Sequence, residues 1–139
     1  MNIYFSCSVT GGRADQQVYK AIVDHLLING HEVPTAHLSD GNIMALEALA
    51  KPQDVYQRDI DWVNGCDVLI AEVSTPSHGV GYEIALALSL AKPVLCCYHK
   101  NRRVSKMITG NTNSTLKVAP YETMEEAIVL VDEFLKSIS

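Results

Sequence analysis

Residues 67–91 read D-V-L-I-A-E-V-S-T-P-S-H-G-V-G-Y-E-I-A-L-A-L-S-L-A, and this stretch decides the fold. Residues 67–73 form a continuous apolar run, which is typical of a strand covered on both faces. Residues 74–81 are rich in Ser, Thr, Pro and Gly and predict a turn. Residues 82–91 are apolar at helical length and predict a buried helix. A strand, a loop and a buried helix make half of a βαβ unit, whose ligands bind at the carboxyl ends of the strands.

Glu83 interrupts the apolar pattern of that helix. We place it in the first helical turn, at the rim of the sheet and beside the loop that precedes it. There a carboxylate either complements the helix dipole or takes part in catalysis, and the pattern alone does not separate the two. Gly79 and Gly81 favour a site, because glycines let the backbone approach a ligand and leave N–H groups that point at it.

Length and composition restrict the class of protein. A chain of 139 residues predicts a single domain, residues 1–139, with a substantial core. The net charge of −5 argues against a nucleic-acid polymer as partner. No apolar run approaches the ~20 residues that span a bilayer. The N-terminus lacks the basic region of a signal peptide. We therefore expect a cytoplasmic protein without a membrane partner.

The four cysteines show no C-x-x-C spacing, and three of them lie inside apolar runs. This pattern is typical of buried thiols in a reducing compartment. We therefore expect no metal site.

The flanks of residues 67–91 complete an α/β pattern. Further strands are expected at 2–7, 31–36, 93–98 and 116–119, and further helices at 13–29, 52–64 and 124–138. Pro34 places the second strand at or near an edge of the sheet. Thr123 and Glu126 form a capping box for the closing helix. The alternation predicts a five-stranded parallel sheet with helices on both faces.

The helix expected from Pro52 to Asn64 carries one carboxylate on its apolar face. Asp59 lies four residues after Val55 and three before Trp62, so the three side chains share one side of the helix. Burial of a carboxylate is costly unless the group is paired or functional. Asp59 is therefore either a structural residue bonded to backbone or a site residue.

The first loop, residues 8–13, resembles an anion site in outline because it joins a strand to a helix N-terminus through glycines. It is equally compatible with an ordinary turn in which Ser8 and Thr10 are caps. On pattern alone, Tyr4 is a core residue and His37 a structural histidine.

Two further segments each allow two interpretations, and one further pair of residues has a structural interpretation. Residues 38–51 have the length of a lid over a flat ligand or of a surface helix. Residues 99–114 carry five basic or imidazole groups, which form either a solvated face or a positive potential for a phosphate. Asp54 and Arg58 are spaced as a surface pair on one helix.

Several of these motifs occur together in one known family. They are Y-F-x-x-S at 4–8 with the following G-G-R, A-H at 36–37, Q-x-D-x-x-W at 57–62, D-V-x-x-A-E-V at 67–73, P-S-x-G-V-G-Y-E at 76–83 and R-V-S-K-M-I-x-G at 103–110. In them the chain resembles the 2′-deoxynucleoside 5′-phosphate N-hydrolases, within the nucleoside 2-deoxyribosyltransferase superfamily. The resemblance runs from Tyr4 to about Tyr121.

The resemblance implies a flavodoxin-like, Rossmann-like sheet and a homodimer. It implies hydrolysis of the N-glycosidic bond of a deoxynucleoside monophosphate, to a free base and 2-deoxyribose 5-phosphate, without a metal or an organic cofactor. By position, Glu83 is similar to the nucleophile that attacks C1′, and Asp59 to its carboxylate partner. Tyr4 would support Glu83. Retaining glycosidases use such a pair of carboxylates.

Substrate contacts are also implied by the resemblance alone. Ser8, Ser77 and the Gly79 backbone would bind the 5′-phosphate, Ser105 would reach it from the neighbouring subunit, and His37 would lie by the base. The remaining implied contacts come from Thr10, Gly11, Gly12, Arg13 and Met107. Mammalian members have Arg, a phosphate ligand, in place of Thr10. Thr10 therefore either weakens the phosphate contact or leaves it to Arg13, Lys106 or the basic segment. Cys7 likewise replaces a glycine.

Two alternatives belong to other classes. A deoxyribosyltransferase would pass the sugar from Glu83 to a second base instead of to water. A non-catalytic module would only bind a nucleotide. The serines of the implied phosphate site favour the hydrolase over the transferase. The presence of both Glu83 and Asp59 argues against a pure binder, because two carboxylates would repel an anionic ligand.

Overall fold

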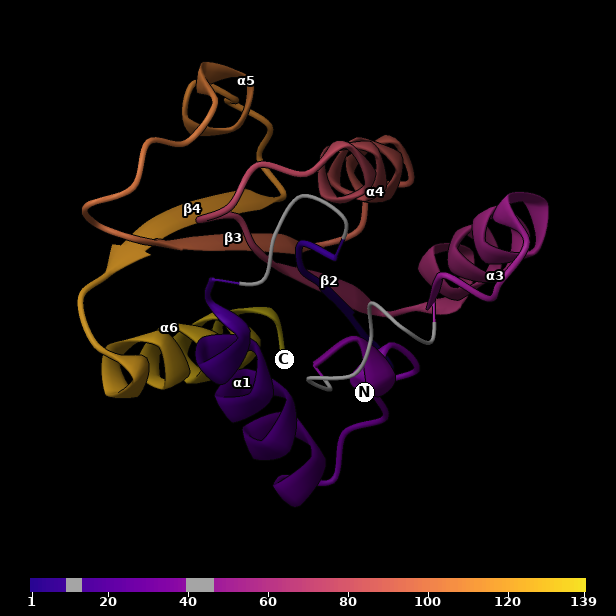
Figure 1. Cartoon of the computed structure of the whole chain (residues 1–139). Coiled ribbons are helices and arrows are strands. Elements are labelled where there is room, and N and C mark those ends of the chain that lie inside the picture. The colour runs from indigo at the N-terminus through magenta and orange to yellow at the C-terminus, as the bar shows by residue number, and fades with distance from the viewer. Residues whose placement is uncertain (10–13, 40–46) are drawn as a thin grey trace.

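The computed structural model describes residues 1–9, 14–39 and 47–139, and its centre is one parallel sheet (Figure 1). The sheet contains four strands in chain order: β1 (Ile3–Ser6), β2 (Val68–Glu72), β3 (Val94–His99) and β4 (Leu116–Tyr121). All three neighbouring pairs are parallel. The carboxyl ends of all four strands therefore lie along one edge.

The prediction of five strands is wrong for the described residues, which form four. Residues 31–36 pair with the edge of β1 only through Glu32, in a single parallel bridge. Pro34 has no N–H with which to continue the pairing. The backbone pairing with β1 has therefore ended at Pro34, and the Thr35 side chain forms the next hydrogen bonds to β1. Its hydroxyl accepts from Phe5 N at 3.0 Å and donates to Phe5 O at 2.7 Å.

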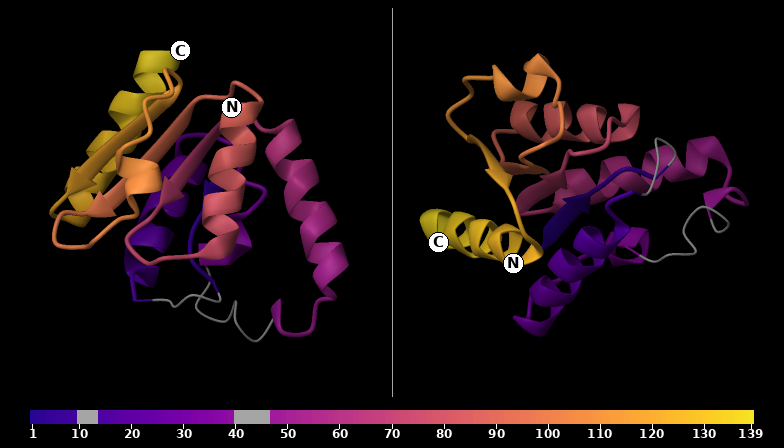
Figure 2. Two further views of the ribbon diagram at one scale, coloured as in Figure 1. Left: turned by 90° about the horizontal axis from the view of Figure 1, so that it is seen from above. Right: turned by 60° about the vertical axis from the view of Figure 1, so that its left-hand side comes forward.

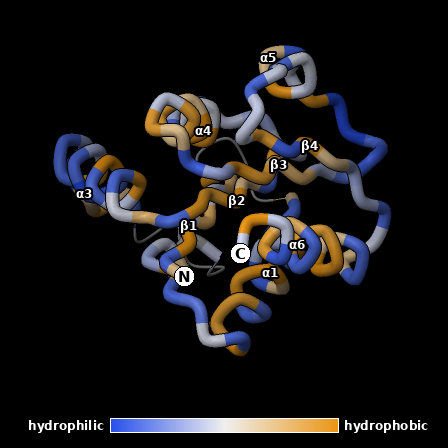
Figure 3. Tube along the Cα trace, turned by 180° about the vertical axis from the view of Figure 1, so that it is seen from behind, coloured by the Kyte–Doolittle hydropathy of each residue, from blue (hydrophilic) through white to orange (hydrophobic). Residues whose placement is uncertain are grey.

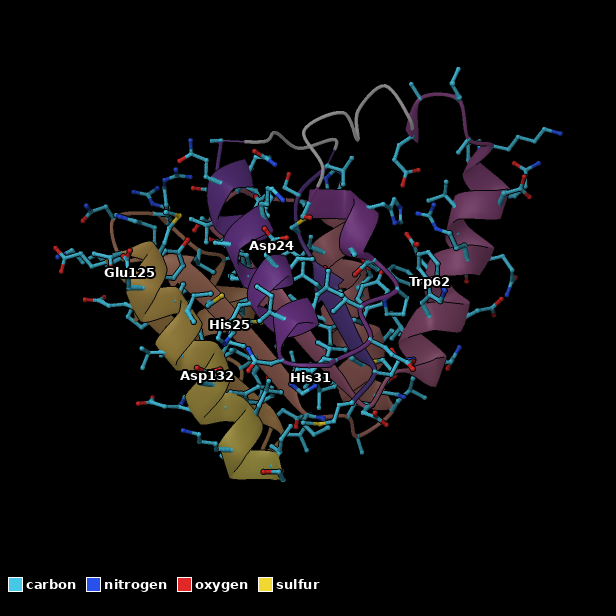
Figure 4. The ribbon with its side chains drawn as sticks, turned by 90° about the horizontal axis from the view of Figure 1, so that it is seen from below. Asp24, His25, His31, Trp62, Glu125 and Asp132 are labelled. Carbon is cyan, nitrogen blue, oxygen red and sulfur yellow. The ribbon has the colours of Figure 1, made fainter. Side chains whose placement is uncertain are left out.

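Helices cover both faces of the sheet (Figures 1 and 2). The elements are α1 (Gln16–Ile28) and α6 (Met124–Ile138) on one face, α3 (Pro52–Gly65) and α4 (His78–Ser89) on the other, with η1 (Ala36–Ser39) after α1 and α5 (Lys106–Thr109) after β3. An ion pair joins α1 to α6, with His25 Nε2 at 2.7 Å from Asp132 Oδ1 (Figure 4). None of the described helices combines the length and the apolarity needed to cross a membrane.

The sheet separates two apolar cores (Figure 3). Successive strand side chains point to opposite faces, so Phe5 packs towards α1 and α6 while Tyr4 packs towards α3 and α4. Both rings are fully buried, so Tyr4 is a core residue as the pattern predicted. The four cysteines are also buried, as their apolar surroundings predicted.

Helix α4 begins earlier than the sequence pattern suggested. Ser77 is its N-cap, and its hydroxyl accepts from Val80 N at 3.4 Å. The glycines of the expected 74–81 turn therefore already belong to the first helical turn. Glu83 consequently lies in the second turn, not the first. Because dipole effects fade beyond the first turn, this placement weakens the purely electrostatic explanation of Glu83.

Candidate active site

A pocket of about 420 Å³ lies beside the carboxyl end of β1, between α3 and α4. Among the described residues its lining comprises Cys7, Val9, Glu47, Ala50, Pro52, Val55, Tyr56, Asp59, Ser77, Gly79, Val80 and Glu83. The pocket thus combines an apolar wall with three carboxylates. Its place at the strand ends is where ligands bind in open α/β sheets.

Glu83 is held from the sheet side by two hydroxyl groups. The Tyr4 hydroxyl donates a short hydrogen bond to Glu83 Oε2, and Ser6 Oγ lies 3.5 Å from Oε1. Tyr4 and Ser6 are two residues apart on β1, so their side chains leave the same face of the strand. Strand β1 therefore fixes a carboxylate carried by α4, although the two residues are far apart in the chain.

The surroundings of Glu83 bring its pKa into the neutral range. Together they raise the pKa of Glu83 to about 7, and burial is the largest cause. The hydrogen bonds from Tyr4 and Ser6 lower this pKa, whereas the negative charge of Asp59 raises it. Burial and the adjacent Glu83 also raise the pKa of Tyr4, so its phenol remains a proton donor. A carboxylate with a pKa near the working pH is typical of catalytic sites.

Asp59 lines the same pocket from α3. Burial raises its pKa, and the guanidinium of Arg58 opposes that rise. Arg58 Nε donates to Asp59 Oδ1 at 2.9 Å, and a second guanidinium nitrogen donates to Glu47 Oε1 at 2.9 Å. The guanidinium also lies over Trp62, 5.0 Å from the ring centroid. Asp59 is therefore a paired carboxylate exposed to the pocket.

Arg58 is a residue whose place the sequence reading missed. The sequence predicts a surface pair with Asp54, whereas in the structure Arg58 pairs with Asp59 and Glu47. A signal was present, because Arg58 directly precedes Asp59 and lies four residues before Trp62. That spacing brings a guanidinium over an aromatic ring on one helix face.

His37 lies behind this group of charges. Its Nε2 is 3.5 Å from Glu47 Oε1, and its ring meets Trp62 edge-on at a centroid distance of 5.8 Å. It is not among the residues that line the pocket. The structure thus brings His37 close to the site through Glu47, and its contact with a base remains a prediction.

The implied phosphate residues are only partly described. Ser8 is fully buried just after β1, and Ser77 both caps α4 and lines the pocket. A Cβ placed on Gly79 would lie 3.8 Å from Glu83 Oε1 and 3.9 Å from Ser77 Oγ, which is ordinary contact. The packing of the protein therefore does not require glycine here. Thr10, Gly11, Gly12 and Arg13 lie outside the described residues, as do residues 40–46 of the 38–51 segment.

Ser105 and Met107 do not line the pocket that holds Glu83. Ser105 caps α5, and both residues line a second pocket of about 420 Å³ between α4 and α5. Ser77 and Val80 belong to the walls of both pockets. Met107 is 84% exposed. Within one chain, these two predicted residues are thus separated from the carboxylates.

The basic segment is partly neutralised by ion pairs. Arg102 donates to both carboxylate oxygens of Asp15, at 3.0 and 3.1 Å, and Lys100 lies 2.7 Å from Glu122. These two cations therefore serve structural pairs. Arg103 lines the second pocket, and Lys106 follows Ser105 at the start of α5. Any positive potential for a phosphate is expected from this end of the segment.

Comparison with known proteins identifies relatives along most of the chain. Residues 3–129 match a family profile described as nucleoside 2-deoxyribosyltransferase. A protein of Methanosarcina mazei, provisionally named 2′-deoxynucleoside 5′-phosphate N-hydrolase 1, is 36% identical over 137 residues, which cover 99% of this chain and 85% of the relative. The 5-hydroxymethyl-dUMP N-hydrolase of Rattus norvegicus is 41% identical over 113 residues, covering 78% and 69%.

Solved structures show the same architecture. The CMP N-glycosidase BcmB of Clostridium botulinum superposes with a TM-score of 0.69 at 20% identity, covering 94% of this chain and 99% of that one. At this identity the likeness concerns the fold, a parallel sheet with helices on both faces.

Proposed function

Because this chain belongs to the nucleoside 2-deoxyribosyltransferase family, we propose that it hydrolyses the N-glycosidic bond of 2′-deoxynucleoside 5′-monophosphates. The products are a free base and 2-deoxyribose 5-phosphate. The observation that carries the proposal is Glu83, a mostly buried carboxylate bonded to Tyr4 and facing a pocket that also contains Asp59. The names of the relatives, which are N-hydrolases, favour water as the acceptor.

Glu83 is the nucleophile in this proposal. Its carboxylate oxygen attacks C1′, the bond between C1′ and the base nitrogen breaks, and the base leaves with the bonding electrons. A covalent glycosyl ester divides one difficult displacement into two easier steps. The Tyr4 hydroxyl, which donates to Glu83 Oε2, fixes the carboxylate, and Oε1, with the longer contact to Ser6 at 3.5 Å, is the attacking atom in this proposal.

Asp59 acts on the departing base in the first step and on the attacking water in the second. It orients the departing base, which leaves as an anion and takes a proton from solvent. It then accepts a proton from the water that attacks C1′, and the ester bond breaks to release Glu83 as a carboxylate. Its pairing with Arg58 supports an ionised Asp59, while Glu83 has a pKa of about 7. Retaining glycosidases also use one carboxylate as the nucleophile and a second carboxyl group at the leaving group and the water, although their second group begins protonated.

The 5′-phosphate binds at the N-terminus of α4. Ser77 and Gly79 lie there beside Glu83, and backbone N–H groups at a helix N-terminus attract anions. Ser8 completes this end in the proposal. The phosphate acts as a remote handle whose binding energy positions C1′ at the nucleophile.

A homodimer would place Ser105 of one subunit near the phosphate of the other. Support comes from the second pocket, in which Ser105 and Met107 are separated from Glu83 within one chain but share Ser77 with its pocket. The strong exposure of Met107 is compatible with contact to a second copy.

The substitution Tyr4→Phe is expected to shift the acid limb of the pH profile of kcat/KM to higher pH. The lost hydrogen bond lowers the pKa of Glu83 in the native protein, so its removal leaves less ionised nucleophile at neutral pH. At pH 7 we expect a loss of about tenfold in kcat/KM. Steady-state rates from pH 5 to 9 measure this, with Tyr98→Phe on β3 as control. The substrate titrates equally in both variants, so an unshifted limb would contradict the role given to Tyr4.

The function itself is tested by incubating the purified protein with each common deoxynucleoside and ribonucleoside monophosphate. Released base is scored by chromatography, with matched unphosphorylated nucleosides alongside. We expect base from monophosphates only. Release from nucleosides alone, increasing when a second base is added, would instead identify a transferase, which the family description keeps as the second candidate. Binding without any release would leave a nucleotide-binding module.

A further inference from the structure

A second buried carboxylate lies at the same sheet edge as the pocket, on the opposite face. Glu72 is the last residue of β2 and is fully buried. It accepts from Ser74 N at 2.6 Å, from Ser74 Oγ at 2.9 Å and from the Tyr121 hydroxyl in a short hydrogen bond. Burial of such a group is costly unless its hydrogen bonds are satisfied, and here three donors converge on it.

These bonds tie together the carboxyl ends of three strands. Ser74 Oγ, which donates to Glu72, also accepts from His99 N at the end of β3, at 2.8 Å. Tyr121 is the last residue of β4, and its carbonyl accepts from Lys100 N at 2.9 Å. Glu72 on β2 is therefore the common partner through which the ends of β3 and β4 are held in register.

Two segments leave the sheet at these strand ends. Residues 74–77 lead to Ser77 and the start of α4, and residues 99–105 lead to Ser105. Asp15, at the start of α1, joins the same two segments a second time, because it accepts from Thr75 Oγ1 at 3.1 Å and from Arg102 at 3.0 and 3.1 Å. Both segments then form facing walls of the pocket between α4 and α5.

We propose that Glu72 is a positioning residue for the phosphate end of the site. It fixes the start of α4, which carries Ser77 and Gly79, relative to the 99–105 segment. This inference rests on the proposed function, in which that helix start binds the 5′-phosphate. Glu83 is held by a different set of bonds, from Tyr4 and Ser6 on β1. Glu72 therefore acts on phosphate binding and not on the chemistry at C1′.

The substitution Glu72→Gln tests this division. The amide keeps the shape of the side chain but replaces one acceptor oxygen by a donor that faces hydroxyl groups. We expect KM for a monophosphate, and the inhibition constant of inorganic phosphate, each to rise about tenfold, because one buried hydrogen bond is commonly worth that factor. Turnover at saturation should change less than about threefold, and the acid limb set by Glu83 should stay in place.

Matched variants separate positioning from general loss of stability. Ser74→Ala removes the hydroxyl that donates to Glu72 and accepts from His99 N, and it should reproduce the rise in KM. Tyr121→Phe is a milder change that should act in the same direction if Glu72→Gln does not fold. Thr35→Val also removes a buried hydroxyl with two bonds, but at the edge of β1. It should lower the melting temperature and leave KM and phosphate inhibition unchanged.

Three outcomes would overturn the inference. They are an unchanged KM in Glu72→Gln, an equal rise in KM in Thr35→Val, and a fall in kcat with a shifted acid limb. If the wild-type protein releases no base, the proposed function fails separately. Calorimetric binding of a monophosphate then decides the role of Glu72, with about tenfold weaker binding in Glu72→Gln supporting it and equal binding overturning it.

Discussion

The substitution Glu83→Gln is expected to reduce release of base from a monophosphate by about 10³-fold or more. The amide preserves the shape of the side chain and still accepts the hydrogen bond from Tyr4, but it is not a nucleophile towards C1′. Single-turnover assays with chromatographic detection of the base measure the loss. Glu133→Gln, on the exposed side of α6, removes the same charge far from the pocket and should have no effect. Release at the wild-type rate would show that Glu83 is not the nucleophile.

The same variant is expected to be more stable than the wild type at alkaline pH. The pKa of Glu83 is about 7 in the fold against a reference of 4.5, so between these values the folded state binds more protons than the unfolded state. The stability of the wild type therefore falls as pH rises through that window. Glu83→Gln lacks this loss and should gain about 1–3 kcal/mol at pH 8 but little at pH 4. Denaturant unfolding at the two pH values measures the difference.

The substitution Asp59→Asn is expected to lower kcat about 10²–10³-fold, with a smaller change in KM. The amide no longer orients the departing base or the attacking water through a charged acceptor, and Arg58 loses the negative charge of its partner at 2.9 Å. The negative charge of Asp59 raises the pKa of Glu83, so its removal should move the acid limb to lower pH. That shift is opposite in sign to the one expected for Tyr4→Phe.

Asp61→Asn is the matched control for this prediction. Asp61 lies two residues further along α3, is exposed, and accepts from Gln57 Nε2 at 2.8 Å. Its removal takes the same charge from the same helix without touching the pocket, so kcat and the pH profile should be unchanged. An equal loss in both variants would trace the effect to the helix and not to the carboxylate in the pocket.

The elements that the sequence predicted best are those whose signals are local. The Pro52 start of α3 and the Thr123 cap of α6 depend on neighbouring residues, and both were confirmed. The return bond of the capping box differs, because the Glu126 side chain accepts from Glu122 N and not from Thr123 N. The fifth strand failed because β-pairing depends on a partner, and residues 31–36 meet β1 only at Glu32. The start of α4 was placed too late because glycines suggested a loop, whereas the Ser77 cap starts the helix before them.

The composition of the site was only partly readable from the sequence. Asp59 was recognised because its helical spacing put it on an apolar face. The contact between Tyr4 and Glu83 was implied by family resemblance alone, since 79 positions separate the two residues and no periodicity connects them. From the sequence, Glu72 was recognised only within the motif at 67–73. A carboxylate at the end of an apolar strand, followed by Ser74, was nevertheless a signal for a buried, hydrogen-bonded group. Two of the donors to Glu72 belong to Ser74, two residues along the chain, whereas the third, the Tyr121 hydroxyl, is brought there only by the fold.

At Gly79, the requirements of folding differ from those of the proposed anion site. An added Cβ would make only ordinary contacts with Ser77 and Glu83, so selection for a stable chain has no strong reason to keep glycine there. Selection for an occupied anion site does, because a methyl group would stand where backbone must approach a ligand. Two surveys of variants would therefore rank alanine differently at this position. One scores the abundance of the protein, and the other scores growth that depends on formation of the reaction product by the enzyme. Positions at which a substitution lowers activity but not abundance would therefore identify the substrate-binding surface without an observed ligand.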